Sequence, residues 1–226
     1  MPSLKLLFRN PEFLLIMVPF HIYVGLFNSL SSLLNSILYP FDFTEEQAGI
    51  AGALLIVVGL VTSAVTSPLI DRSKAFLMAI KIQVPIVALC YLIFIWMPPT
   101  KGIAGVYVVL SLLGAASFSL VPVALEFVTE ITYPVSPEIA SVVCWSGGQL
   151  YGGIFIVVSD KLTDGANGGP GGSTPNNMQR TLWFHAVIGI VVAVLPMFLG
   201  VGKRTDKVRL RRLEADRSWR ERDGGR

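Results

Sequence analysis

The chain has 226 residues, of which 53% are hydrophobic, and 18 Lys and Arg against 15 Asp and Glu give it a formal net charge of +3. Charged residues make up only 15% of the sequence, against about 25% in soluble domains, and 15 of these charges lie in the last 24 residues. Residues 1–202 are therefore too apolar for a water-exposed surface, and nucleic acid is not expected as a partner because the positive balance lies almost entirely in the tail.

Mostly apolar stretches, separated by short polar segments, fill the chain before this tail. They cover residues 12–38, 47–69, 75–97, 102–127, 137–159 and 181–202. Each has about twenty or more residues, the length that an α-helix needs to cross a hydrocarbon core of roughly 30 Å. The sequence therefore predicts an all-α membrane protein, with a cytosolic lead-in at 1–11, a bundle of six transmembrane helices at 12–202 and a basic cytosolic tail at 203–226.

The basic residues are divided unevenly between the two sides of this predicted bundle. Fourteen Lys and Arg residues lie in the lead-in, between the second and third segments or in the tail, whereas the other side has only Lys101, Lys161 and Arg180. Cytosolic loops carry the excess of Lys and Arg, so both termini are expected in the cytosol of a multi-pass integral membrane protein. The sequence leaves open whether this is the plasma membrane or an internal membrane.

The first predicted helix carries a polar stripe with helical spacing, formed by His21, Gly25, Asn28, Ser32 and Asn35. Polar groups are costly in hydrocarbon, so this face is expected to meet protein or water. It either packs against another helix or lines a central aqueous cavity, and both interpretations remain open at this point. Tyr23 and Phe27 flank the stripe and are candidates for aromatic walls.

The fifth predicted helix combines small and polar residues on one side. Gly148 and Gly152 form a G-x-x-x-G pattern, which favours close approach of another helix. Gln149 can donate and accept hydrogen bonds, and Trp145, one turn before it, offers a ring face to a cation. This side is again open to two interpretations, a packing surface or a ligand site.

Local patterns mark two helix starts. Thr44 and Gln47 have the spacing of a capping box. Ser136, followed by a proline and Glu138, is expected to cap the fifth helix. The two cysteines, Cys90 and Cys144, lie within predicted spans and are expected to be packing residues, not a disulfide.

Charged residues gather at the predicted cytosolic helix ends. Asp71, Arg72 and Lys74 follow the second segment, and Glu126 and Glu130 end the fourth. The two glutamates are either solvated interface residues or partners of Arg72 and Lys74 across the cytosolic mouth. The five residues together are candidates for a gate.

The sequence contains no recognisable catalytic motif. It has no H-E-x-x-H, no G-x-S-x-G, no paired intramembrane aspartates and no glycine-rich phosphate loop. His21 and His185 have no intramembrane carboxylate nearby in the sequence, which disfavours a proton relay. We therefore expect no enzyme, no catalytic residue, no metal site and no cofactor.

Three motifs resemble those of known transporters. The sequence DRSK at 71–74 resembles the cytosolic D-R motif that major facilitator superfamily transporters carry between the second and third helices of each half. The run EFVTEITYP at 126–134, together with SSLLN at 31–35, resembles one branch of that superfamily. This branch is the feline leukaemia virus subgroup C receptor family of choline, ethanolamine and haem transporters.

The resemblance extends over residues 4–202 and implies the carboxyl-terminal half of a twelve-helix bundle, with an amino-terminal six-helix half as the missing partner. It implies that Gln149 matches a glutamine that contacts the ammonium substrate. In the family an aromatic side chain boxes a quaternary ammonium at the position of Asn28, so this sequence departs from the pattern there. The candidate substrate-binding residues are Gln149, Asn28, Trp145, Tyr23 and His21.

The function implied by the resemblance is alternating-access transport of a small solute. The expected substrate is a small organic cation such as choline or ethanolamine, for which the amide and indole groups are suited, or haem, for which His21 is the candidate iron ligand. The alternative is a non-transporting half-transporter or regulatory membrane protein that binds a partner bundle.

Overall fold

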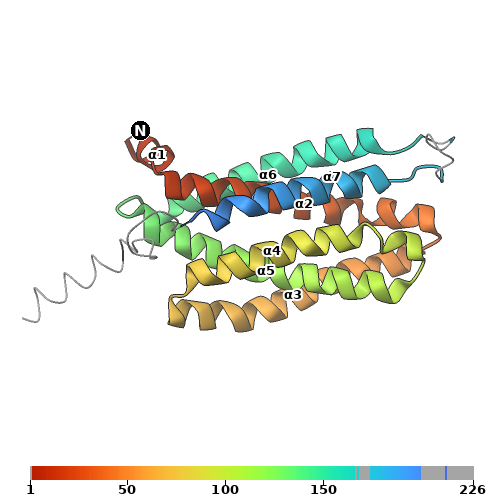
Figure 1. Ribbon diagram of the computed structural model, residues 1–226, viewed down its shortest axis with the longest axis horizontal. Helices are drawn as coiled ribbons and strands as arrows, with labels where there is room; N and C mark the ends of the chain where they lie inside the picture. The colour runs from red at the N-terminus through yellow and green to blue at the C-terminus, as the bar shows by residue number, and fades with distance from the viewer. Residues whose placement is uncertain (1, 166, 168–173, 200–211, 213–226) are drawn as a thin grey trace, which may run out of the picture.

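The structure is a computed structural model that describes residues 2–165, 167, 174–199 and 212. Long helices run side by side along one axis and form an elongated bundle (Figure 1). They are α2 (Pro11–Leu38), α3 (Glu45–Ser73), α4 (Phe76–Phe94), α5 (Ile103–Thr132), α6 (Pro137–Leu162) and α7 (Gln179–Met197). The short helix α1 (Pro2–Phe8) precedes them, and 3-10 turns η1 (Tyr39–Phe41) and η2 (Pro98–Thr100) follow α2 and α4.

Each of the six helices α2 to α7 is long and apolar enough to cross a membrane. The prediction of an all-α, multi-pass membrane protein is thereby confirmed. The predicted ends differ by a few residues: α5 continues to Thr132 instead of 127, whereas α4 ends at Phe94 instead of 97. Residues 200–211 and 213–226 lie outside the described part of the chain. The end of the last predicted span and almost all of the predicted tail fall in these residues.

The two predicted caps have different outcomes. At the start of α3, the backbone N–H of Gln47 donates to Thr44 Oγ1 at 3.2 Å, and the backbone N–H of Thr44 donates to Gln47 Oε1 at 3.0 Å. The capping box is thereby confirmed. Ser136 occupies the N-cap position of α6 as predicted, with a first-turn proline and Glu138 after it, but its hydroxyl donates to the carboxylate of Glu138 and makes no capping bond to the backbone.

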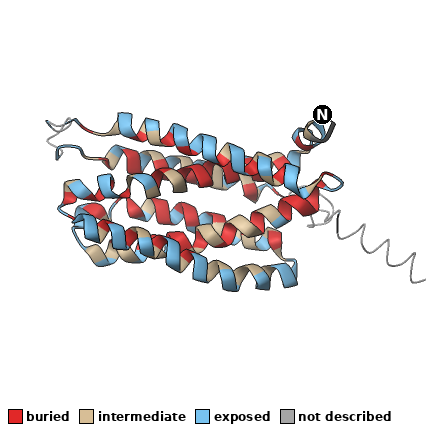
Figure 2. Ribbon diagram, turned by 180° about the vertical axis from the view of Figure 1, so that it is seen from behind, coloured by how far each residue is buried: buried red, intermediate tan, exposed pale blue. Residues whose placement is uncertain are grey.

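The helices form two groups. In Figure 1, α2, α6 and α7 lie above α3, α4 and α5. Within these groups α2 packs on α6 and α7 while α5 packs on α3 and α4, and the packing of α7 on α4 joins the two groups. Buried residues face the interior and exposed ones the outside (Figure 2). Many exposed side chains are large and apolar, for example Val61, Leu150 and Val191, as expected for surfaces that meet lipid or another bundle. Cys90 and Cys144 are buried and free, which confirms their assignment as packing residues.

Glycines bring α2 and α6 into close contact. A Cβ added at Gly25 of α2 would lie 2.9 Å from Tyr151 Cβ, and one added at Gly148 of α6 would lie 2.7 Å from a methyl of Val24. Small residues allow such backbone approach between membrane helices. The packing interpretation of the G-x-x-x-G pattern is therefore confirmed.

One buried polar cluster joins α2, α6 and α7. His185 Nε2 lies 3.2 Å from Ser29 Oγ and 3.3 Å from Ser159 Oγ, and the two hydroxyls are 3.3 Å apart. Thr181 Oγ1 also donates to the backbone carbonyl of Ser159 at 3.0 Å. Because all four side chains are almost completely buried, the cluster ties the three helices together in the interior.

Candidate functional site

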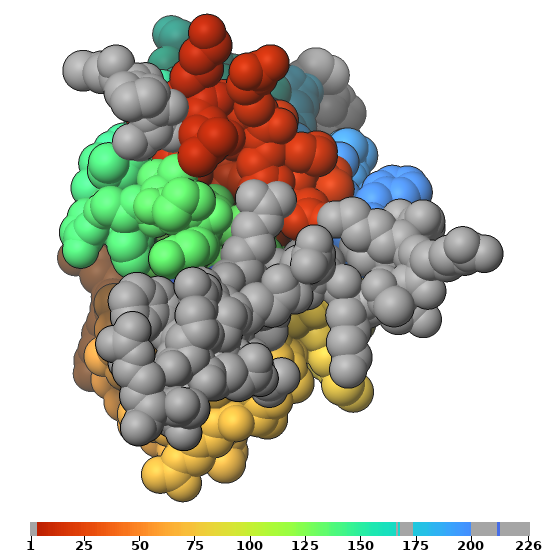
Figure 3. Space-filling view, turned by 90° about the vertical axis from the view of Figure 1, so that its left-hand side faces the viewer, coloured from red at the N-terminus to blue at the C-terminus, as the bar shows by residue number. Residues whose placement is uncertain are grey.

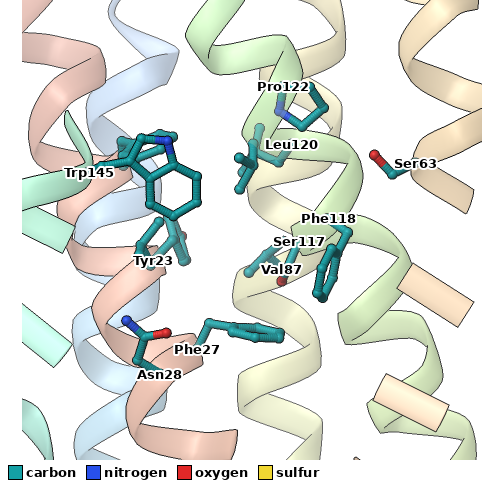
Figure 4. Close-up of a pocket in the computed structure, with 13 residues that line it drawn as sticks. Tyr23, Phe27, Asn28, Ser63, Val87, Ser117, Phe118, Leu120, Pro122 and Trp145 are labelled. Atoms are coloured by element: carbon teal, nitrogen blue, oxygen red, sulfur yellow. The ribbon is translucent and has the colours of Figure 1, made fainter. Parts of the chain in front are cut away.

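A pocket of about 350 Å³ lies where the two groups of helices meet. Its lining comes from α2, α3, α4, α5 and α6, and in Figure 4 side chains of α2 and α6 face those of α5 across it. The aromatic lining residues are Phe20, Tyr23, Phe27, Phe118 and Trp145. The thirteen lining residues include no charged one. A pocket of this size and apolar character suits a small organic molecule.

Edge-to-face pairs fix the orientation of the aromatic rings. Phe20 and Trp145 have ring centroids 5.7 Å apart at an interplanar angle of 89°, and Phe27 and Phe118 have centroids 5.4 Å apart at 84°. Such pairs are a preferred arrangement of aromatic side chains. Each pair joins two helices, α2 with α6 and α2 with α5, so the helix packing itself shapes the aromatic walls.

The structure places three predicted aromatic residues, Tyr23, Phe27 and Trp145, in this pocket, and adds Phe20 and Phe118, which sequence reasoning missed. The Tyr23 hydroxyl donates to the carbonyl of Gly189 on α7 at 2.7 Å, so its ring stays available to the pocket while its polar end is satisfied elsewhere. Phe20 lies one turn before Tyr23, and this helical spacing is a signal that could have identified it. Phe118 on α5 gave no such signal, because it is one of many apolar residues in that helix.

The predicted amides come together at the edge of the pocket. Asn28 lines the pocket, and its Nδ2 donates to Gln149 Oε1 at 3.1 Å. Gln149 is exposed and is not among the lining residues. It is connected to the pocket by its hydrogen bond with Asn28. A Cβ added at Gly152 would lie 3.0 Å from both Cβ and Nδ2 of Asn28, so this glycine makes room for the amide.

His21 lies apart from the pocket, in the contact between α2 and α6. Its Nε2 is 3.2 Å from the carbonyl oxygen of Val143. A Cβ added at Gly147 would lie 2.3 to 2.5 Å from atoms of the His21 ring, so the ring rests directly on that backbone. The polar stripe is thus divided: His21 and Gly25 pack against α6, and Asn28 lines the pocket.

The candidate gate residues lie at one end of the bundle. The carboxyl-terminal ends of α3 and α5 share this end with the chain's N-terminus (Figure 1), and Figure 3 views the molecule from there. Lys74 Nζ lies 2.6 Å from Asp71 Oδ1, an exposed pair within one helix end. Arg72 and Glu126 are exposed, whereas Glu130 is only 5% exposed. The interpretation of Glu130 as a solvated interface residue is therefore wrong.

No family model matches the chain. Three curated relatives illustrate its similarity to known proteins. Solute carrier family 49 member A3 of Xenopus tropicalis is 29% identical over 198 residues, covering 87% of this chain and 41% of the relative. The choline/ethanolamine transporter FLVCR1 of Mus terricolor is 30% identical over 188 residues, covering 83% of this chain and 32% of the relative. The choline/ethanolamine transporter FLVCR2 of Homo sapiens is 25% identical over 216 residues, covering 94% and 39%.

The matches extend over most of the chain, although the chain spans less than half the length of these relatives. They agree with the motifs at 71–74 and 126–134 and with the observed bundle of apolar helices. The chain therefore belongs to the feline leukaemia virus subgroup C receptor family of the major facilitator superfamily.

Proposed function

We propose that this bundle is one half of a transporter that carries a small organic cation across the membrane by alternating access. The observation that carries the proposal is the pocket, whose described lining residues include five aromatic side chains and no charged one. Ring faces attract cations, and the attraction increases when the site excludes water. An ammonium ion can therefore be held here without a buried carboxylate.

The relatives support this substrate class. Two of the three proteins described above are named choline/ethanolamine transporters, and the third is named as a solute carrier. Choline and ethanolamine are both small ammonium ions. The names also favour transport over the alternative of a regulatory half that binds only a partner.

A second six-helix bundle is the proposed partner. Major facilitator transporters bind their substrates near the bilayer midplane between two six-helix halves, and alternating access arises when the halves rock about that site. The chain spans 41% and 32% of two relatives' length, which leaves room in those proteins for a second bundle. In this arrangement the aromatic pocket is one wall of the site, and the second bundle supplies the other.

The geometry favours an organic cation over haem. His21, the candidate haem ligand, lies in the contact between α2 and α6 and does not line the pocket. Tyr23, Asn28 and Trp145 line it directly. We therefore assign Tyr23, Asn28 and Trp145 to the substrate wall, with Gln149 supporting Asn28 from outside.

Uptake of radiolabelled choline and ethanolamine tests the proposal. The assay compares cells that express the protein together with its second bundle, in one chain or two, with cells that lack it. Saturable uptake of at least one of the two cations is expected. Uptake no greater than in the control cells, with the protein present at the membrane, would contradict the proposed function.

A further inference from the structure

Asn28 has a special position among the residues that line the pocket. Of the thirteen described lining residues, it alone carries a side-chain amide. It lies beside aromatic rings, with Tyr23 five residues before it and Phe27 next to it in the sequence (Figure 4). A hydrogen-bonding group at this point lies beside the rings whose faces attract cations.

The Asn28 amide has a defined orientation. Its Nδ2 donates to Gln149 Oε1 on α6 at 3.1 Å, and the open position of Gly152 lets the amide lie close to the α6 backbone. Figure 4 shows the consequence: the nitrogen of Asn28 points away from the pocket, and the carbonyl oxygen points into it, toward α5. The pocket is thus provided with a hydrogen-bond acceptor that Gln149 holds in place.

The other polar groups of the pocket do not duplicate this acceptor beside the rings. The Tyr23 hydroxyl is engaged with the carbonyl of Gly189. The Ser63 hydroxyl lies 3.3 Å from the Ser67 hydroxyl on its own helix, and in Figure 4 it is on the far side of α5 from Asn28. Ser117 belongs to the opposite wall of the pocket.

We propose that the Asn28 carbonyl, positioned by Gln149, accepts a hydrogen bond from an N–H of the bound ammonium ion, so that the site prefers amines that retain an N–H over fully methylated ones. This inference rests on the proposed function and adds the substrate selectivity. A quaternary ammonium has no N–H to give. When such an ion displaces water from the pocket, the Asn28 carbonyl loses a partner without gaining one, and an unsatisfied buried acceptor costs free energy.

A pair of probes isolates this one hydrogen bond. Choline and N,N-dimethylethanolamine both carry a hydroxyl and, at neutral pH, a positive charge, and they differ by one methyl group in place of one N–H. Their binding is measured by calorimetry on the protein in lipid nanodiscs, with its second bundle present. The ratio of the two dissociation constants reports the N–H because contributions from the hydroxyl and the charge cancel.

The protein is expected to bind dimethylethanolamine about tenfold more tightly than choline, the effect of one hydrogen bond to a positively charged donor. Asn28→Leu keeps the side-chain size but removes the acceptor, so the preference for dimethylethanolamine should disappear or reverse, because its N–H would then enter the pocket without a partner. Gln149→Leu changes an exposed residue and keeps the acceptor, but it releases the amide, so the ratio should fall in part. Asn35→Leu, the same kind of change at an exposed position on α2 outside the pocket, should leave the ratio unchanged.

The outcomes separate the two proposals. If both probes bind and their ratio is the same in the unaltered protein, Asn28→Leu and Gln149→Leu, the selectivity role of Asn28 is overturned while the organic-cation site stands. If neither probe binds the folded protein, the proposed function fails, and the inference fails with it. If Asn28→Leu does not fold, the test rests on Gln149→Leu: a smaller ratio than in the unaltered protein supports the role of Asn28, and an unchanged ratio overturns it.

Discussion

Gly114 of α5 lies directly over the backbone of Leu55 in α3, so closely that a Cβ added at Gly114 would be 1.9 Å from the Leu55 carbonyl oxygen. The obstacle is main chain on both sides and cannot be relieved by turning a side chain. Where α3 and α5 cross, their separation is therefore set by the absence of a single methyl group. This contact also positions the helix that carries Phe118 and Ser117 into the pocket.

The first prediction concerns this crossing. Gly114→Ala should force α3 and α5 apart and lower the free energy of unfolding by about 1–3 kcal/mol or more, as overpacking does in other tightly packed interiors. The midpoint of thermal unfolding in detergent measures the effect. Gly153→Ala on α6 is the matched control, because nothing lies within 4 Å of a Cβ added there. Equal midpoints for the two variants would contradict the packing argument.

The second prediction concerns the aromatic wall. Trp145→Ala removes the indole that pairs edge-to-face with Phe20, and it should weaken choline or ethanolamine binding at least tenfold, about 1.4 kcal/mol. Trp183→Ala is the control, since Trp183 is also half-exposed and also pairs edge-to-face with an aromatic residue, Trp96, but outside the pocket. His21→Ala should likewise leave cation binding intact. A loss of cation binding in His21→Ala with normal binding in Trp145→Ala would contradict the assignment of Trp145 to the substrate wall.

The third prediction concerns orientation. The excess of basic residues before α2, after α3 and in the tail predicts that this end of the bundle faces the cytosol. In intact cells a membrane-impermeant maleimide should label Thr174→Cys, which is exposed before α7, but not Ser73→Cys, which is exposed at the end of α3. Permeabilised cells should show labelling of both. The reverse pattern in intact cells would invert the topology and with it the placement of the gate.

The fourth prediction concerns the gate. Arg72 is exposed at the end of α3, far along the helix from Ser63, which lines the pocket. Arg72→Ala should therefore reduce the maximal rate of transport more than the apparent substrate affinity, through a shift between conformations of about 1–3 kcal/mol. Initial rates over a range of substrate concentrations separate the two effects. Arg180→Ala, which removes an exposed arginine paired with Asp164 at the opposite end, is the control.

Much of the fold could be predicted from the sequence because its signals are local. The spans follow from runs of apolar residues, and the capping box at Thr44 requires only side chains three residues apart. The close contact at Gly148 and Gly152 follows from the small size of these residues. The N-cap position of Ser136 was equally local and is also observed, but its capping hydrogen bond is absent because the hydroxyl donates to the neighbouring carboxylate of Glu138.

The composition of the site was harder to predict. In a membrane bundle both the lipid-facing and the inward-facing sides of a helix are apolar, so periodicity does not show which phenylalanines meet. Phe27 and Phe118, 91 positions apart in the sequence, form an aromatic pair that no local pattern indicated. The polar stripe on α2 was visible, but only the structure separates His21, which packs on Gly147, from Asn28, which lines the pocket.

The hydrogen-bonded group of Ser29, Ser159 and His185 has a mechanical consequence. Separating α2 from α6 and α7 would break the contacts of Ser29 with Ser159 and His185, at a cost of about 1–3 kcal/mol for each buried group left without a partner. A rearrangement that kept the three helices together would avoid this cost. The group therefore ties α2, α6 and α7 together, and any rearrangement that keeps these helices together also keeps the mutual spacing of Asn28 on α2 and Trp145 on α6.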